Sequence, residues 1–243
     1  MSAPTRVQAD TQAVASAVPQ QEPEHVPSLA EQYADLASQA YAPRRVDLVL
    51  RGLDILIAGS ALIVLSPLLG LLALATLLTS GRPVLYRGQR VGRAGQVFTM
   101  YKLRTLKAGA EVRLGNVYGE ALSRRTEEEV TRVGRFARLT HIDEVPQLWN
   151  VVKGDMSIVG PRPVRPAFFY RLVDEVPQYW QRLVVRPGVT GFAQTRITRE
   201  DSWEDKLIHD LEYIADRSIR LYLRVLGATI ARIIRLTFSG RNR

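Results

Sequence analysis

Residues 53–78 read LDILIAGSALIVLSPLLGLLALATLL, and this stretch decides the fold of the chain. No charged residue lies between Ile55 and Gly81. As a helix, the stretch would be about 40 Å long at ~1.5 Å per residue, more than the roughly 30 Å hydrocarbon core of a bilayer. A buried helix of a soluble protein is the alternative, but such long soluble helices usually carry a polar stripe. The stretch is therefore expected to insert into a membrane.

Two features predict that this helix enters and leaves the membrane on the same side. Ser66 and Pro67 lie near its middle, and a proline removes a backbone hydrogen bond, so a break is expected there. The flanks on both sides are basic, and basic flanks tend to stay in the cytoplasm. A reentrant helix satisfies both flanks, whereas a kinked helix that spans the bilayer is the alternative. The flanking cations are Arg44, Arg45 and Arg51 before the run, and Arg82, Arg87, Arg90, Arg93, Lys102, Arg104 and Lys107 after it.

The chain divides into three parts around this helix. Residues 1–43 have one arginine, five carboxylates and no sustained apolar pattern, which predicts a mostly disordered tail with a short helix around Leu29–Tyr41. Residues 44–82 contain the reentrant helix, and residues 83–243 are expected to form a cytoplasmic domain. The total charge is +9, so everything after the tail carries +13, which favours an anionic partner. The chain has no cysteine, which excludes disulfides and thiolate metal sites.

The domain is predicted to begin with a β-hairpin. Val84–Tyr86 and Val97–Tyr101 are rich in β-branched and aromatic residues and are separated by a glycine-containing turn. The hairpin would present a basic surface beside the membrane, on which Lys102 and Arg104 are expected to bind substrate phosphate. A solvated cationic face that holds lipid headgroups is the alternative.

The sequence DEVPQ occurs twice, at residues 143–147 and 174–178. Paired carboxylates serve acid/base, nucleophilic and metal chemistry. For the first pair, the alternative is a capping box in which Thr140 and Asp143 start a helix. Basic residues surround this pair in the sequence, namely Arg135, Arg138, Lys153 and Arg162, the last on a stiff Gly-Pro-Arg-Pro turn suited to gripping a phosphate. Such a setting usually includes Mg²⁺ held jointly by carboxylate and phosphate oxygens. The second pair is expected on an amphipathic helix with its acids solvated or in local ion pairs.

These residues together resemble the monotopic phosphoglycosyl transferases, bacterial sugar transferases that act on polyprenol phosphate. The resemblance covers about residues 45–234. It rests on the RxxDxxLRGLD segment with its Ser66-Pro67 break, YKLRTL, THIDEVPQLWNVVKGDMSIVGPRP, RPGVTGFAQ and HDLEYIADRSIRLYLRVL. The last motif has His209 where the family usually has tyrosine.

The resemblance implies an irregular α+β fold of a reentrant helix, a small sheet and amphipathic interfacial helices. It also implies transfer of a sugar-1-phosphate from a UDP-sugar to polyprenol phosphate, with release of UMP, at the cytoplasmic face of the bacterial inner membrane. Asp143 would be the nucleophile and the Mg²⁺ ligand, and Glu144 its partner. Lys102, Arg138 and Arg162 match the basic active-site positions of the family, and Asp210 matches the acid of its C-terminal motif.

Several questions stay open at the level of sequence. The family often carries Gly-Arg before a tryptophan, but this chain has Thr198 five residues before Trp203, and Arg196 or Arg199 could replace that arginine. The basic C-terminal segment, about residues 203–238, is predicted to lie on the membrane or to pack on the domain. A membrane-tethered binding module and an inactive scaffold are the rival functions. No nucleic-acid-binding motif is found, and a homodimer is neither predicted nor excluded.

Overall fold

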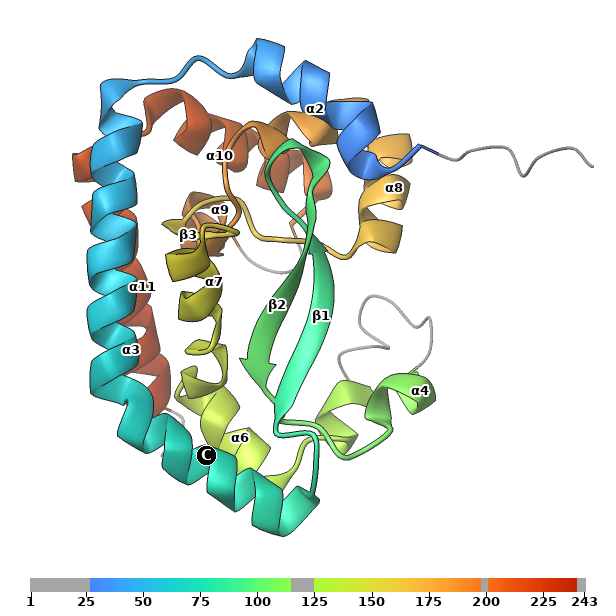
Figure 1. Cartoon of the computed structure of the whole chain (residues 1–243), viewed down its shortest axis with the longest axis vertical. Coiled ribbons are helices and arrows are strands. Elements are labelled where there is room, and N and C mark those ends of the chain that lie inside the picture. The colour runs from blue at the N-terminus through green and yellow to red at the C-terminus, as the bar shows by residue number, and fades with distance from the viewer. Residues whose placement is uncertain (1–26, 115–124, 198–200, 240–243) are drawn as a thin grey trace, which may run out of the picture.

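A computed structural model gives the structure of residues 27–114, 125–197 and 201–239. Residues 1–26, 115–124, 198–200 and 240–243 lie outside this described part. The described chain is mostly helical with two small sheets, which agrees with the irregular α+β class predicted from the sequence (Figure 1).

The elements follow one another without a regular strand–helix repeat. The helices are α2 (Leu29–Ala40), α3 (Arg45–Ser80), α4 (Ala110–Leu114), α6 (Arg132–Leu139), α7 (Gln147–Lys153), α8 (Pro166–Glu175), α9 (Phe192–Arg196), α10 (Trp203–Asp216) and α11 (Ile219–Ser239). The strands are β1 (Leu85–Val91), β2 (Val97–Leu103), β3 (Ser157–Val159) and β4 (Gly188–Thr190), and the short 3₁₀ helices are η1 (Arg93–Gly95), η2 (Ile142–Glu144) and η3 (Pro177–Val184).

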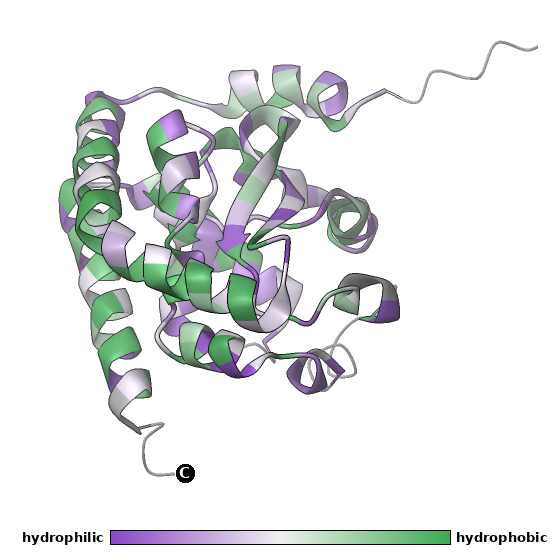
Figure 2. Ribbon diagram, turned by 60° about the horizontal axis from the view of Figure 1, so that its bottom comes forward, coloured by the Kyte–Doolittle hydropathy of each residue, from purple (hydrophilic) through white to green (hydrophobic). Residues whose placement is uncertain are grey.

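Helix α3 is long and apolar enough to cross a membrane, and little of it is buried in the protein. It stands at one edge of the molecule with α11 beside it, and hydrophobic residues predominate along it (Figures 1 and 2). Leu71 and Leu78 are 66% and 76% exposed. Side chains of this kind are suited to contact with lipid.

A complete break at Ser66-Pro67 is not confirmed, because α3 continues as one helix through Pro67, although this helix bends (Figure 1). The local reason is a hydrogen bond. Pro67 has no N–H to donate to the carbonyl four residues earlier, that of Ile63. The hydroxyl of Ser66 donates to this carbonyl instead, at 2.8 Å. Ser66 thus satisfies the oxygen that Pro67 leaves without its helical partner, which lets the helix continue.

The N-terminal part of α3 is bonded to the domain through a buried carboxylate. Oδ1 of Asp54 accepts from Ser157 Oγ at 3.0 Å, from the Ile158 backbone N–H at 2.9 Å and from the Tyr222 hydroxyl at 3.0 Å. One oxygen therefore joins α3, β3 and α11. One turn away, Arg51 donates to the carbonyls of Val151 and Val152, at the end of α7.

The C-terminal end of α3 is bonded to the same domain. Nη2 of Arg104 donates to the carbonyls of Ser80 and Gly81 at 2.5 and 2.7 Å. These are the last residue of α3 and its cap, whose carbonyls have no partner within the helix. Both ends of the apolar helix are thus held by one domain.

The predicted hairpin is confirmed. Strands β1 and β2 pair antiparallel from Leu85 opposite Leu103 to Val91 opposite Val97. The free edge of β2 is covered by Asn150 of α7, whose Nδ2 donates to Thr99 O at 2.7 Å and whose Oδ1 accepts from Tyr101 N at 3.1 Å. This fully buried amide places α7 beside β2.

The second sheet carries the Gly-Pro-Arg-Pro turn. Strands β3 and β4 are parallel, and Gly160 directly follows β3. A Cβ added to Gly160 would lie 2.5 Å from Arg186 O, so only glycine lets the two backbones approach this closely.

The short helix expected in the tail is present as α2, and it packs on the domain. Tyr33 meets the ring of Phe169 edge-on at 5.6 Å and stacks on Trp180 at 6.5 Å. Leu29 is buried in the same hydrophobic cluster.

Helix α11 packs on the domain with one face, as one of the two alternatives predicted, while contact of its other face with the membrane stays a prediction. Tyr222 and Val225 are buried in the domain core, and Thr229 exchanges a 2.7 Å hydrogen bond with Thr190. On the other face, Leu223 and Ile234 are about half exposed.

Asp54→Ala is expected to lower the free energy of unfolding by about 3 kcal/mol or more, because three buried donors lose their acceptor. Tyr222→Phe removes one donor and should cost about 1 kcal/mol. Thermal unfolding of the full chain in detergent measures both, with Asp35→Ala, on the exposed face of α2, as the control. Equal melting temperatures for Asp54→Ala and Asp35→Ala would contradict the role given to Asp54.

Candidate active site

The first acidic pair lies in a tight turn between α6 and α7. Thr140 ends α6, and its hydroxyl donates to the carbonyl of Phe136 at 2.9 Å. His141 adopts the left-handed conformation, with φ 55°, which is uncommon for a residue with a side chain. Asp143 and Glu144 follow in η2, and α7 starts after Pro146. The capping box predicted for Thr140 and Asp143 is therefore wrong, because Thr140 closes the preceding helix.

Glu144 is held by the hairpin. Its Oε1 lies 2.6 Å from Nζ of Lys102, and the two side chains are 23% and 20% exposed. Burial alone would raise the pKa of Glu144, but the charges of Lys102 and Arg162 outweigh it, so the pKa lies below its ordinary value. Glu144 is accordingly ionised at neutral pH and already engaged.

Asp143 has the opposite environment. Its carboxylate accepts no hydrogen bond and forms no ion pair within the described residues. Burial and the neighbouring charge of Glu144 raise its pKa from 3.8 to about 6, against the opposing charges of Lys102, Arg138 and His141. Two adjacent carboxylates with divergent pKa values are suited to different chemical roles. Asp143 is the free one, and its anion is poorly stabilised.

Three of the predicted basic residues surround this pair. Lys102 contacts Glu144 directly. Arg138 donates from Nε to Thr105 Oγ1 at 2.8 Å, and its charge acts on Asp143. Arg162 is exposed, and its charge acts on Glu144. The structure therefore brings Lys102, Arg138 and Arg162 to the side of the dyad.

Arg104 and Asp210, also predicted to bind substrate, make different contacts. Arg104 bonds to the end of α3 and is only 8% exposed. Its Nε and Nη1 are buried without a hydrogen-bond partner in the described chain, a state that costs about 1–3 kcal/mol for each donor. Asp210 is buried in α10 and pairs with Arg182 at 2.7 Å, both side chains being 6% exposed.

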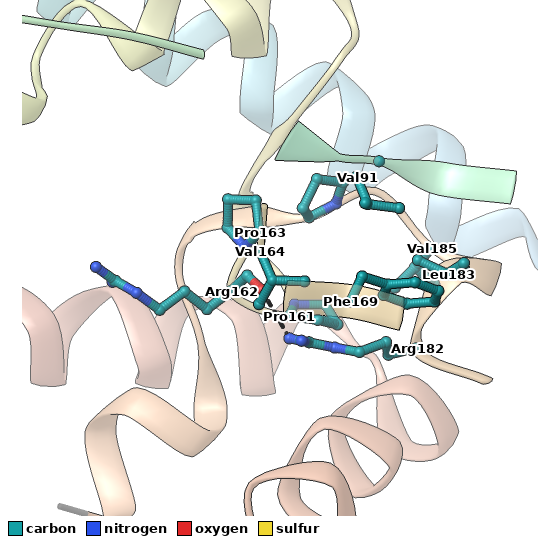
Figure 3. A pocket seen from close by; sticks show the side chains of 11 residues that line it. Val91, Pro161, Arg162, Pro163, Val164, Phe169, Arg182, Leu183 and Val185 are labelled. Carbon is teal, nitrogen blue, oxygen red and sulfur yellow. Dashed lines mark hydrogen bonds between the residues drawn. The ribbon is translucent and has the colours of Figure 1, made fainter. Parts of the chain in front are cut away.

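The Arg182–Asp210 pair supports the Gly-Pro-Arg-Pro turn from below. Nη2 of Arg182 also donates to the backbone carbonyl of Arg162 at 2.8 Å (Figure 3). The Tyr179 hydroxyl accepts from Nη1 of the same guanidinium. Asp210 thereby fixes the guanidinium of Arg182, which in turn bonds to the backbone of the Arg162 turn. We assign it to positioning Arg162, since within the described residues its carboxylate is used by Arg182.

A small cavity lies beneath this turn and is mostly apolar. Its lining includes Val91, Pro161, Val164, Phe169 and Leu183. The Arg162 side chain extends away from these residues (Figure 3). The cavity is therefore a gap behind the turn, and the charged face of the turn lies on the other side.

The second acidic pair has the expected exposed setting. Glu175 ends α8 and pairs with Arg171 at 2.8 Å, with both side chains about half exposed. Asp174 is exposed. The following Tyr179 is buried in the hydrophobic cluster that includes Phe169 and packs against Tyr33. This second DEVPQ thus contributes to hydrophobic packing through Val176, and its acids lack the set of cations that surrounds Asp143 and Glu144.

Arg196, one of the two arginines considered for the family's missing position, lies over the Phe192 ring at 4.1 Å and 3.4 Å from Glu212. His209 contacts the same glutamate at 3.1 Å. Arg199 lies outside the described residues.

Sequence reasoning missed three residues that shape the site. His141 provides the left-handed turn, Arg182 supports the Arg162 turn, and Asn150 places α7 on β2. Asn150 was missed because an asparagine inside a helix usually lies at a solvated position, and no sequence periodicity marks this asparagine as buried. Arg182 follows the second DEVPQ and lies 20 positions after Arg162, so no local pattern links it to the Arg162 turn.

The described residues fit a Mg²⁺ ion shared between Asp143 and a substrate phosphate. In the described part of the chain, no group of three or more histidine, aspartate or glutamate side chains is placed to hold a metal. Mg²⁺ commonly binds through one or two carboxylates, with water and substrate phosphates completing its shell. The unpaired carboxylate of Asp143 suits that arrangement.

Comparison with known proteins places these features in a family. The family described as "Bacterial sugar transferase" matches residues 45–236. The chain is 37% identical over 187 residues to the "UDP-N-acetylgalactosamine-undecaprenyl-phosphate N-acetylgalactosaminephosphotransferase" of Aeromonas hydrophila, covering 76% of this chain and 43% of that protein.

Two further relatives are covered over more of their own length. Identity is 38% over 197 residues to the "UDP-glucose:undecaprenyl-phosphate glucose-1-phosphate transferase" of Caulobacter vibrioides, covering 78% of this chain and 71% of that protein. It is 37% over 194 residues to the "Exopolysaccharide production protein PSS" of Rhizobium leguminosarum, covering 76% and 95%. The chain thus spans less than half of the first relative and nearly all of the last.

Asp143→Asn is expected to stabilise the metal-free fold at pH 7 by about 1–3 kcal/mol, since a carboxyl pKa raised by about two units penalises the ionised form by that order. The folded chain takes up this proton near pH 6 and the unfolded chain only near pH 3.8. Wild-type stability from this group therefore rises as the pH falls from 7 to 4, and the advantage of the variant shrinks over the same range.

Unfolding in detergent with EDTA at pH 7 and pH 4.5 measures this difference, with Asp174→Asn as the exposed control. If Asp143→Asn destabilised the chain at pH 7, the account of Asp143 as a poorly stabilised anion would be wrong.

Proposed function

Because this chain belongs to the bacterial sugar transferase family, we propose that it transfers a sugar-1-phosphate from a UDP-sugar to polyprenol phosphate and releases UMP. The observation that carries the proposal is the contrast within the dyad. Glu144 is ionised and paired with Lys102, while Asp143 is free and has a raised pKa. A free carboxylate among cations is a competent nucleophile toward phosphorus.

In the first step, a carboxylate oxygen of Asp143 forms a bond to the β-phosphorus of the UDP-sugar. The bond from that phosphorus to the oxygen bridging the two phosphates breaks, and UMP leaves with the electron pair. In the second step, an oxygen of polyprenol phosphate bonds to the same phosphorus and Asp143 leaves as a carboxylate. The product is a lipid diphosphate sugar, and the enzyme returns to its starting state.

The surrounding residues have distinct parts in this chemistry. Arg138 and Arg162 lower the cost of bringing a dianionic diphosphate to a carboxylate. Lys102 keeps Glu144 in place. Glu144 in turn orients Asp143 and can accept a proton from the incoming lipid phosphate. The Arg182–Asp210 pair keeps the Arg162 turn in position. A Mg²⁺ ion held by Asp143 and the diphosphate would add charge neutralisation.

We further propose that α3 is reentrant and that the domain lies on the cytoplasmic face of the bacterial inner membrane. Two attachments support this topology. Asp54 bonds one part of α3 to the domain, and Arg104 bonds its far end to the same domain. A helix crossing the bilayer would carry these two attachments to opposite faces. The basic flanks favour the cytoplasmic side.

The proposal explains why a soluble and a lipid substrate can meet. The dyad lies between the hairpin that follows α3 and the helix α7 that packs on α3. Donor specificity is not decided by these contacts. The inactive-scaffold alternative gains no specific observation, since the dyad and its cations are assembled.

The activity is tested by UMP release in lipid nanodiscs with Mg²⁺ and a panel of UDP-sugars, with and without undecaprenyl phosphate. One UDP-sugar should give lipid-dependent turnover, which Asp143→Asn lowers by about 1000-fold or more because the nucleophile is lost. Asp174→Asn, in the second DEVPQ, should stay within twofold of wild type. Full activity in Asp143→Asn would refute the nucleophile, and no UMP from any donor that binds would favour the scaffold.

The topology is tested with reporter tags before residue 1 and after residue 243 in bacterial cells. Both tags should be protected from a protease added outside the inner membrane, because a reentrant helix returns the chain to the cytoplasm. Tags on opposite faces would show that α3 spans the bilayer.

A further inference from the structure

Arg104 lies where the apolar helix meets the strand of the active site. Its backbone N–H donates to Val84 O at 2.8 Å and extends the hairpin by one residue. Lys102 is two residues earlier, so the two side chains start from the same face of the strand. Nη2 of Arg104 already donates to the two carbonyls at the end of α3.

The remaining donors of this guanidinium are unmet. Nε and Nη1 are buried and have no hydrogen-bond partner in the described chain, and no ion pair joins Arg104 to a described carboxylate. The sequence offers none nearby, since no acid occurs from residue 55 to residue 110. The helix end supplies only a partial negative charge. A buried cation with unmet donors needs an anion.

The surroundings of Arg104 connect it to both the lipid side and the dyad. Leu103 and Ile142, the neighbours of Arg104 and Asp143 in sequence, belong to one hydrophobic cluster with Leu72 of α3. Leu71 and Leu78, on either side along α3, are largely exposed. An anion at Arg104 would therefore lie beside an apolar helix surface and close to the residues that flank the nucleophile.

We propose that Arg104 binds the phosphate of the lipid acceptor, whose hydrocarbon chain lies along the exposed face of α3. The assignment rests on the proposed function and divides the cations of the site between the two substrates. Arg138 and Arg162 face the dyad and receive the soluble diphosphate, Lys102 holds Glu144, and Arg104 faces α3 and receives the lipid phosphate. In the chain without lipid, Nε and Nη1 of Arg104 are buried where α3 meets the strand. Binding of the acceptor therefore opens this contact.

The test measures lipid binding without any UDP-sugar, so it stands whether or not a donor has been found. The full chain in detergent is mixed with undecaprenyl phosphate or phosphatidylglycerol, and lipid adducts are counted by native mass spectrometry. The variants are Arg104→Gln, Arg104→Lys and the control Arg135→Gln, an exposed arginine of α6. The two lipids separate an acceptor site from a site for any phospholipid phosphate.

The undecaprenyl phosphate adduct should fall at least tenfold in Arg104→Gln and about threefold in Arg104→Lys, which keeps the charge but loses the fork of donors. It should be unchanged in Arg135→Gln, and the phosphatidylglycerol adduct should be unchanged throughout. Wild-type adduct levels in Arg104→Gln, or equal losses for both lipids, would overturn the assignment. If Arg104→Gln does not fold, as judged by its melting curve, Arg104→Lys decides.

Once a reacting donor is known, kinetics provide a second readout. Arg104→Lys should raise the KM for undecaprenyl phosphate severalfold and leave the KM for the UDP-sugar within twofold. A residue that only supports α3 would instead lower kcat without separating the two substrates. A raised KM for the UDP-sugar alone would also overturn the proposal.

Discussion

The structure depends on attaching both ends of one apolar helix to one polar domain. Asp54 does this near the start of α3 with three hydrogen bonds to one oxygen, and Arg104 does it at the end with two bonds from one nitrogen. Between these attachments, the helix presents leucines outward and keeps its backbone bonds, with Ser66 compensating for Pro67. Because buried polar groups must be paired, these few contacts set the depth and direction of α3 more strictly than its apolar side chains do. The position of the dyad relative to this apolar helix follows from them.

The chemistry of the dyad comes from unequal neighbours. Asp143 and Glu144 share one turn, yet only Glu144 is reached by Lys102. The ion pair keeps the charge of Glu144 in place, and burial together with this fixed charge raises the pKa of Asp143. His141 contributes through its backbone, because its left-handed conformation directs the turn between α6 and α7. Such strain is tolerated where the surrounding structure enforces it, which is common at functional sites.

Sequence reasoning could predict the features that depend on local pattern. Apolar run length predicted the long apolar helix, and β-branched clusters predicted the hairpin. The basic surroundings predicted in sequence for Asp143 and Glu144 are also found in space, beside Lys102, Arg138 and Arg162. Sequence reasoning did not predict which distant group pairs with a given polar side chain. Arg104 and Lys102 are two residues apart in a basic strand, yet one bonds to a helix end and the other to a carboxylate. Asp210 is paired with Arg182 across 28 positions, and no spacing rule indicates that pair. At Ser66-Pro67 the helix bends without a complete break, and the Ser66 hydroxyl takes the place of the missing N–H as donor to the Ile63 carbonyl.

Helix α2 lies before the stretch that matches the family, yet its Tyr33 packs on Phe169, which also lines the cavity behind the Arg162 turn. The leading segment and the residue that follows the Arg162 turn, Val164, therefore belong to one hydrophobic cluster. A truncation at the family boundary would uncover aromatic rings that are now protected, and such a surface tends to aggregate. In evolutionary terms, a lineage that exchanges the segment before residue 45 must bring with it another group that fills this aromatic site. The boundary drawn by sequence similarity is thus not the boundary at which the protein can be cut.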